Sequence, residues 1–202
     1  MIRLEKEGGL WIVTLDRPDK ANALTPAMLA RLADIAESAT QARALILTGE
    51  GRVFSAGADL DAARAGMTLS PDWERLSNAL AALPALKVAA LNGTLAGGGV
   101  GMALACDLRI AVPGARFFYP VMRLGFLPQP SDCRRLVALV GPARARLILM
   151  AGARLDADEA LAIGLIDRIV PAQDLMATAR ELVADVLAAD PDIAQGIARL
   201  CS

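Results

Sequence analysis

The 202-residue sequence contains no histidine. A Ser-His-Asp or Cys-His mechanism is therefore excluded, and any general acid or base must be Asp, Glu, Lys, Tyr or Cys. Cysteine is scarce, because Cys106, Cys133 and Cys201 lie far apart and form no Cys-x-x-Cys pair. Without histidine these three residues make neither a zinc site nor a disulfide framework. We expect them to be buried small apolar side chains, and we expect no bound metal.

A net charge is also nearly absent, because 21 basic residues balance 22 acidic ones. Such a surface favours neither nucleic acid nor an anionic membrane as a partner. Long apolar runs are missing too, since the longest without glycine, Ala79–Leu86, is far below the roughly 20 residues that span a bilayer. The N-terminus, MIRLEKEGGLW, carries charges where a signal peptide would be apolar. We therefore expect a soluble, cytoplasmic protein.

The chain does have the length and the hydrophobic content, 55%, of one domain with a single core. Short apolar runs at Leu10–Leu15, Ala44–Leu47 and Leu86–Leu91 predict buried strands. Thr25-Pro26 predicts the start of a helix between the first two strands. Strands alternate with helices along most of the chain, which predicts an α/β fold. Further strands are expected at Leu108–Val112, Arg116–Phe118 and Ile166–Val170, and further helices at 70–83, 98–105 and beyond Ser131, with a break at Gly141-Pro142 and a capping box at Asp156 and Glu159.

The stretch Leu95–Asp107, LAGGGVGMALACD, places three glycines between a predicted strand and a predicted helix. Such a turn aims unpaired backbone N–H groups at a ligand. The spacing matches neither the G-x-G-x-x-G/A dinucleotide motif nor a P-loop or nucleophile elbow. A second small-residue turn, FSAGADL at Phe54–Leu60, follows the strand Ala44–Leu47. Two such turns can place two N–H donors around one oxygen, which is the geometry of an oxyanion hole.

With these motifs, the sequence resembles the crotonase superfamily, the enoyl-CoA hydratase/isomerase group. The resemblance runs from about Leu10 to Leu187. It implies a crotonase-like spiral of repeated ββα units with a helical C-terminal part, usually assembled into homotrimers or hexamers. We expect a core domain at residues 1–190, whereas residues 191–202 would be a short remnant of the helices that close the site and build the trimer in longer members. The matching segments, in order, are DRPDKANALTPAM, FSAGADL, LNGTLAGGGVGMALACDLRIA, ARFFYPVMRLGFLP and LMAGARLDADEALAIGLIDRIVP.

The resemblance also implies a substrate, an extended acyl-CoA thioester, with coenzyme A as part of that substrate and no separate cofactor. The backbone N–H groups of Ala58 and Gly98 would hold the thioester carbonyl oxygen, and residues 56–61 would line the adenine and pantetheine path. Arg17 and Lys20 lie in a loop that resembles a segment contacting coenzyme A, and contact with phosphate and simple solvation both stay open for them. The residues expected to line the substrate are Ala56, Gly57, Asp59, Leu60, Asp61, Lys20, Gly97, Gly101 and Val121.

The pattern departs from the family at both glutamates that its hydratases use, because the corresponding positions are Gly101 and Val121. General acid–base groups contribute roughly 10²- to 10⁴-fold each, so their loss argues against standard enoyl-CoA hydration. Related isomerases and dehalogenases carry an aspartate at a position that aligns with Gln129. The nearest acid is Asp132, which is either a relocated base or, as the sequence favours, part of the N-cap of a helix beginning at Ser131.

Other acids are weaker candidates. Tyr119 and Asp61 could transfer protons, whereas Asp59 is expected to hold the oxyanion loop in shape. Three functions stay open. The first is an enzyme that stabilises a thioester enolate without the usual glutamates, for example a decarboxylase, in which loss of CO₂ creates the enolate without a base. The second is a noncatalytic acyl-CoA-binding or assembly protein, and the third is a hydratase that uses Asp132.

Overall fold

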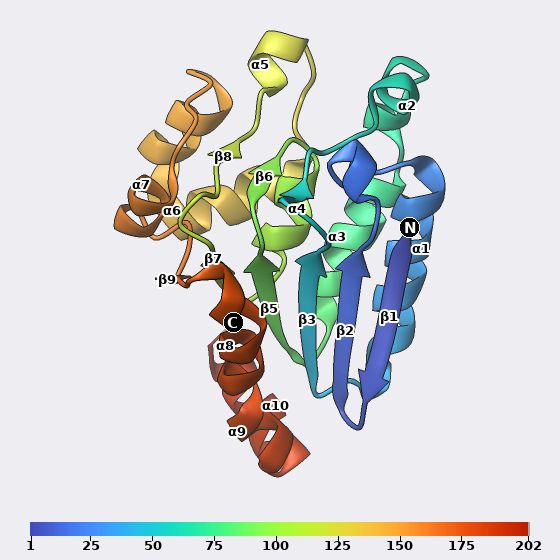
Figure 1. The fold of residues 1–202 in the computed structure, drawn as a ribbon, viewed down its shortest axis with the longest axis vertical. Coiled ribbons are helices and arrows are strands. Elements are labelled where there is room, and N and C mark those ends of the chain that lie inside the picture. The colour runs from blue at the N-terminus through green and yellow to red at the C-terminus, as the bar shows by residue number, and fades with distance from the viewer. Residues whose placement is uncertain (202) are drawn as a thin grey trace.

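The computed structural model describes residues 1–201, in which two sheets organise the chain (Figure 1). The larger sheet has six strands in the order β1-β2-β3-β5-β7-β9. Its first two strands form an antiparallel hairpin, and all later neighbours are parallel. The smaller sheet is parallel, in the order β4-β6-β8. The strands are β1 (Ile2–Glu7), β2 (Leu10–Leu15), β3 (Ala44–Gly49), β4 (Val53–Ser55), β5 (Leu86–Leu91), β6 (Thr94–Ala96), β7 (Leu108–Ala111), β8 (Phe117–Phe118) and β9 (Arg168–Ile169).

A ββα unit occurs three times in succession. Each unit gives its first strand to the large sheet and its second to the small sheet, and then continues into a helix. This arrangement confirms the predicted spiral of ββα units and the α/β class. The units are β3–β4 with α2 (Leu60–Arg64) and α3 (Asp72–Ala82), β5–β6 with α4 (Gly99–Leu104), and β7–β8 with α5 (Val121–Leu124) and α6 (Pro130–Leu149).

Helix α1 (Pro26–Ser38) shows how local signals build these elements. Thr25 is its N-cap and accepts a hydrogen bond from the N–H of Met28, with Pro26 in the first turn. Its apolar face is buried, and the helix packs beside α3 on one side of the large sheet (Figure 1). Strands β2 and β3 of that sheet are mostly apolar and buried along almost their whole length, as expected where both faces of a parallel sheet are covered.

The C-terminal part is helical, as predicted. Helix α6 breaks at Gly141, whose backbone is not helical, and the Asp156–Glu159 capping box opens α7 (Ala157–Ala162). Helix α8 (Leu175–Leu182) packs against β5 and β7. The division into residues 1–190 and 191–202 stays a prediction. The remaining helices are α9 (Ala184–Ala188), α10 (Pro191–Leu200) and the single 3₁₀ turns η1 (Pro18–Lys20), η2 (Ala39–Gln41), η3 (Met67–Leu69) and η4 (Ala172–Asp174).

Asn22 joins the loops that lead into the second small-residue turn. Its side chain is fully buried, donates to the carbonyls of Glu50 (2.9 Å) and Val53 (2.7 Å), and accepts from the N–H of Arg17 (2.8 Å). Its own carbonyl accepts from the hydroxyl of Ser55 at 3.0 Å. A buried polar group with all partners in place fixes these loops against the core. These hydrogen bonds of Asn22 therefore fix the position of the turn that follows β4.

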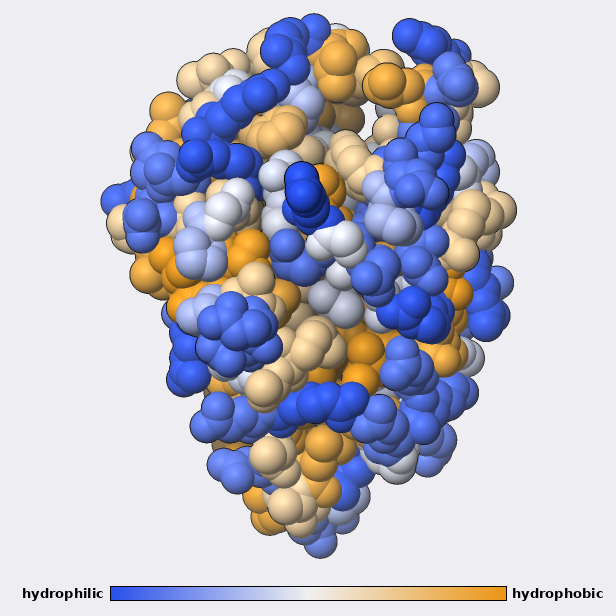
Figure 2. Space-filling model, in the orientation of Figure 1, coloured by the Kyte–Doolittle hydropathy of each residue, from blue (hydrophilic) through white to orange (hydrophobic). Residues whose placement is uncertain are grey.

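The surface of the described residues is mixed, with polar and apolar side chains interspersed on the face drawn in Figure 2. None of the helices in residues 1–201 combines the length and the apolar content that a membrane span requires, and no group of Cys, Asp and Glu in these residues could hold a metal ion. All three cysteines are free. The prediction that they are buried holds for Cys106 but is wrong for Cys133, which is half-buried, and for Cys201, which is exposed at the C-cap of α10.

Candidate active site

The two small-residue turns singled out in the sequence touch each other. Gly57 has φ +90°, and an ideal Cβ on it would lie 3.0 Å from the carbonyl oxygen of Ala96, the Cα of Gly97 and the backbone nitrogen of Gly98. Any larger residue would combine a strained backbone with a clash against main-chain atoms that cannot move. The turn after β4 therefore packs its backbone directly onto the turn after β6.

Two backbone N–H groups at this contact have no protein acceptor. Leu24 binds the turn after β4 from one side, donating to the carbonyl of Gly57 (2.7 Å) and accepting from the N–H of Asp59 (2.8 Å). The intervening Ala58 is in an extended pairing with Leu24, so its N–H points to the opposite side. Across residues 1–201, neither this N–H nor that of Gly98 donates to a protein atom. Both groups are free to bind a ligand oxygen.

Asp132 lies in the first turn of α6, and its two carboxylate oxygens have different surroundings. The side chain is 3% exposed. Oδ2 accepts a hydrogen bond from the hydroxyl of Tyr119 at 2.9 Å, whereas Oδ1 is buried without a partner. A buried, unpaired carboxylate oxygen is costly, and such groups gather where a protein does chemistry.

The prediction that Asp132 caps this helix is wrong. The N-cap residue is Gln129, and no side chain caps the helix from that position. Glu74, on α3, takes over the task, because its Oε1 accepts from both the N–H of Ser131 (2.9 Å) and its hydroxyl (2.8 Å). With the helix terminus satisfied from another element, Asp132 is left without a structural role at the cap.

Burial raises the pKa of Asp132 to about 6, and the negative charge of Glu74 adds to the rise. The Tyr119 hydrogen bond and the charge of Arg135 act in the opposite direction. Burial also raises the pKa of Tyr119 far above its usual value, so that this hydroxyl remains a donor. A carboxyl that titrates near neutral pH can both accept and return a proton under physiological conditions.

Gly101 leaves the space that the Asp132 carboxyl occupies. An ideal Cβ on Gly101 would lie 2.4 Å from Oδ1 and 3.0 Å from Cγ of Asp132. Gly98, Gly101 and Asp132 line one small pocket together with Gln129 and the indole of Trp73. The ring of Trp73 lies directly against Gly98, 2.6 Å from an ideal Cβ at that residue. The structure thus brings the only buried carboxyl of this pocket to the glycine turn.

Asp59 and Arg17 form an ion pair at 2.8 Å, with side chains about one-fifth exposed. The guanidinium also donates to the carbonyl of Ala23 at 2.9 Å, so the solvated alternative for Arg17 is wrong. The other oxygen of Asp59 accepts from the N–H groups of Asp61 (3.1 Å) and Ala62 (3.3 Å), which caps α2. The Arg17 hydrogen bond lowers the pKa of Asp59. These contacts tie the end of the turn after β4 to the segments on either side of η1.

The remaining predicted residues fall into an exposed and a buried group. The exposed ones are Lys20, Ala56, Leu60 and Asp61, and Asp61 pairs with Arg64 on the surface of α2. The buried or half-buried ones are Gly97, Gly101 and Val121, the last at the start of α5. The sequence did not single out Trp73 or Glu74, because both stand within an ordinary amphipathic helix and their contacts come from segments distant in the chain.

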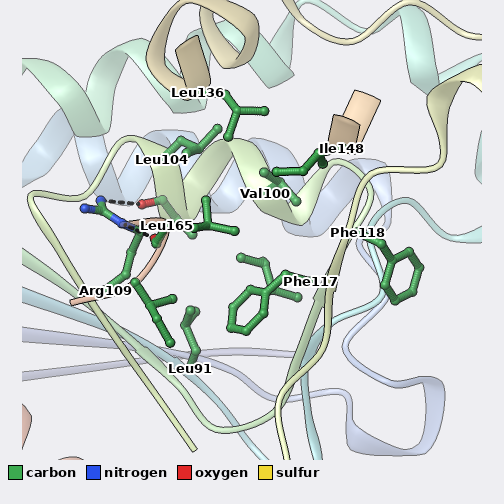
Figure 3. A pocket seen from close by; sticks show the side chains of 12 residues that line it. Leu91, Val100, Leu104, Arg109, Phe117, Phe118, Leu136, Ile148 and Leu165 are labelled. Carbon is green, nitrogen blue, oxygen red and sulfur yellow. Dashed lines mark hydrogen bonds between the residues drawn. The ribbon is translucent and has the colours of Figure 1, made fainter. Parts of the chain in front are cut away.

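A second, wholly apolar pocket lies on the other side of α4 (Figure 3). Arg109 borders it, but its guanidinium donates to the carbonyls of Leu165 (2.9 Å) and Cys106 (2.7 Å) and is occupied by structural bonds. No residue predicted for the site lines this pocket, and every lining residue except the half-buried Phe118 is buried in the core. The side chains drawn around it include Leu91, Val100, Leu104, Phe117, Leu136, Ile148 and Leu165.

Comparison with known proteins identifies the family to which the chain belongs. The family model for Enoyl-CoA hydratase/isomerase matches residues 5–199. The short-chain-enoyl-CoA hydratase of Clostridium acetobutylicum is 35% identical over 197 residues, which cover 93% of this chain and 76% of the relative. Among solved structures, Pseudomonas aeruginosa DspI is similar with a TM-score of 0.90 and 33% identity, covering 99% of this chain and 85% of that chain. An enoyl-CoA hydratase from Bacillus anthracis is similar with a TM-score of 0.86 and 31% identity, covering 96% and 79% respectively.

The contact between residues 101 and 132 predicts a strong coupling in a double-mutant cycle. Gly101→Ala should destabilise the wild-type fold by about 1–3 kcal/mol, because the new methyl overlaps the Asp132 carboxyl. In an Asp132→Gly background the same change should be neutral or stabilising, since alanine favours a helix by up to ~1 kcal/mol over glycine. Urea unfolding of the four proteins measures the coupling. Gly196→Ala, in the open surroundings of α10, is the additive control; a coupling of zero at residue 101 would refute the overlap.

The raised pKa of Asp132 predicts how stability depends on pH. Between about pH 4, where an unfolded aspartate titrates, and about pH 6, the folded state binds more protons than the unfolded state. Stability therefore falls as the pH rises through this window, by up to about 3 kcal/mol from this one group. Asp132→Asn should remove that fall. Unfolding free energies of both proteins from pH 4 to 7 test this, and parallel curves would contradict it.

Proposed function

Because the chain belongs to the enoyl-CoA hydratase/isomerase family, we propose that it binds an acyl-CoA thioester and transfers a proton at the α-carbon of the acyl group. The thioester oxygen lies between the N–H groups of Ala58 and Gly98, and Asp132 is the acid and base. The observation that carries this proposal is the unpaired Oδ1 of Asp132, buried in the same pocket as Gly98. It supplies the proton-transfer group that Gly101 and Val121 do not.

The two N–H groups stabilise the charge that develops on the thioester oxygen. Removal of a proton from the α-carbon turns the thioester into an enolate, whose negative charge lies mostly on that oxygen. Each well-placed donor in such a site contributes roughly 3–4 kcal/mol to the transition state. Both donors belong to the backbone, so the side chains of Ala58 and Gly98 need only be small.

One carboxyl limits the reactions that fit. Asp132 can remove a proton and later return it, as in enolisation or the movement of a double bond. Val121 offers no second acid, and it is buried among apolar residues. Chemistry in which one group handles the proton throughout therefore suits this pocket better than chemistry that needs two carboxylates.

The surface near the glycine turn suits an extended ligand. In Figure 1, α2 and α5 stand on either side of the region above β6 and α4, and Figure 2 shows a notch at the top of the molecule in that area. Ala56 and Leu60 are exposed on the α2 side, and the exposed Lys20 offers an ammonium group to a phosphate. We also propose that the protein assembles into trimers or hexamers, because members of this family usually do.

A second candidate is a noncatalytic acyl-CoA-binding protein of the same fold. Gly101 and Val121 favour it, because the two positions expected to carry glutamates have lost them. The two candidates share the oxyanion contacts and differ only in whether Asp132 moves protons. A test of turnover and binding on the same protein separates them.

We predict that the protein exchanges the α-protons of butyryl-CoA with deuterium in D₂O, measured by NMR. Asp132→Asn should slow this exchange by roughly 10²- to 10⁴-fold, because it removes the proposed base, while binding measured by calorimetry persists. Asp158→Asn, on the exposed side of α7, is the control for loss of one carboxylate.

The outcomes have distinct meanings. Binding without exchange, and without turnover of crotonyl-, malonyl- or methylmalonyl-CoA, supports the noncatalytic protein. Loss of CO₂ from malonyl-CoA that is unchanged in Asp132→Asn indicates decarboxylation, which needs no base. Exchange that is equal in the wild type and Asp132→Asn removes Asp132 from the mechanism.

A further inference from the structure

Tyr119 makes the two oxygens of the Asp132 carboxylate unequal. Its hydroxyl donates to Oδ2 at 2.9 Å and leaves Oδ1 without a partner, and Oδ1 lies nearer than Oδ2 to an ideal Cβ on Gly101, at 2.4 Å against 3.0 Å. No other protein donor within residues 1–201 binds Oδ2, and none binds Oδ1. The hydroxyl therefore fixes Oδ2 and restrains rotation of the carboxylate, which leaves Oδ1 as the oxygen without a partner.

The small sheet holds Tyr119 in place. The residue is 6% exposed and directly follows β8, which pairs with β6. The carbonyl of Phe118 accepts from the N–H of Gly97 at 3.2 Å, and the carbonyl of Tyr119 accepts from the N–H of Val121 at 2.9 Å. One pair of short strands thus positions both the glycine turn and the hydroxyl that holds Asp132. The small sheet, rather than a flexible loop, therefore fixes the distance between the glycine turn and the Tyr119 hydroxyl.

From this geometry we infer that Tyr119 is a positioning residue, which holds Asp132 so that Oδ1 alone exchanges protons with the bound thioester. The inference deepens the proposed function and rests on it. In the step, the C–H bond at the α-carbon breaks, an O–H bond forms on Oδ1, and the electron pair passes to the thioester oxygen. The reverse step returns the proton to carbon, and the Tyr119 O–H stays on Oδ2 throughout.

The charged and titratable groups around Asp132 determine how loss of the Tyr119 hydroxyl changes the pKa of its carboxyl. Glu74, on α3, raises the pKa of the carboxyl, whereas Arg135, on α6, and the Tyr119 hydrogen bond lower it. Cys133 is its neighbour in the chain, and burial together with the charge of Asp132 raises the pKa of that thiol, which keeps it neutral. On the α4 side, Gly101 and Met102 carry no titratable group. Removing the Tyr119 hydroxyl therefore shifts the balance in one direction, toward protonated Asp132.

Tyr119→Phe tests the inference through properties that a merely structural role would not change. The pKa of Asp132, measured by ¹³C NMR of the carboxyl, should rise by about one unit, because a hydrogen bond to a charged group contributes about that much. The acidic limb of the pH profile for α-proton exchange should move upward with it. At neutral pH, kcat should fall about tenfold with little change in KM, since the base is less ionised and less well oriented.

Thr48→Val is the matched control, because it deletes another buried hydroxyl, bonded to the carbonyl of Ala90 at 2.8 Å, from the large sheet. It should lower stability without moving the pKa of Asp132 or the pH profile. A folded Tyr119→Phe protein with an unchanged Asp132 pKa would overturn the inference. The NMR titration needs no substrate, so absence of turnover in the wild type counts against the proposed function, while an upward pKa shift in the variant still supports the role of Tyr119.

Discussion

The contact between the backbone of Gly57 and the turn at residues 96–98 is the constraint on which the rest of the site depends. Two turns that follow different strands of the small sheet meet without intervening side chains, and Leu24 holds one of them from behind. That packing leaves the N–H groups of Ala58 and Gly98 without a protein acceptor within residues 1–201. A polar group left free beside a pocket costs stability unless a ligand completes it, so the arrangement favours a ligand with an acceptor oxygen.

The same pocket also contains a carboxyl, Asp132, whose negative charge is opposite in sign to the positive ends of the two N–H groups. A buried carboxyl with one unpaired oxygen is destabilising when ionised, and its pKa near 6 reflects that cost. The fold accommodates this carboxyl because Gly101 leaves space for it and Tyr119 binds one of its oxygens. Glu74 caps the start of α6, so Asp132 is not needed there. The donors act on a developing negative charge and the carboxyl on the proton that leaves, so together they suit one step, enolate formation.

The fold could be predicted from the sequence wherever the pattern is local. The apolar runs gave β2, β3, β5 and β7, Thr25-Pro26 gave the start of α1, and Asp156 with Glu159 gave the capping box. Strand β1 was not predicted, because its residues are mostly charged and polar and it lies at the edge of the sheet. Strands β4 and β6 were missed because each is too short for an alternating pattern. The orientation of Asp132 depends on Glu74 and Tyr119, which lie far away in the chain, so sequence spacing favoured a cap that the structure does not contain.

The convergence of Ala58 and Gly98 on one thioester oxygen is tested most directly by a crystal structure of the protein with a nonreactive acyl-CoA analogue bound. The account predicts that the carbonyl oxygen of the analogue lies about 3 Å from both backbone nitrogens, with the α-carbon next to Oδ1 of Asp132. A carbonyl oxygen that binds only one of these nitrogens, or an acyl group placed away from the Asp132 carboxyl, would contradict it.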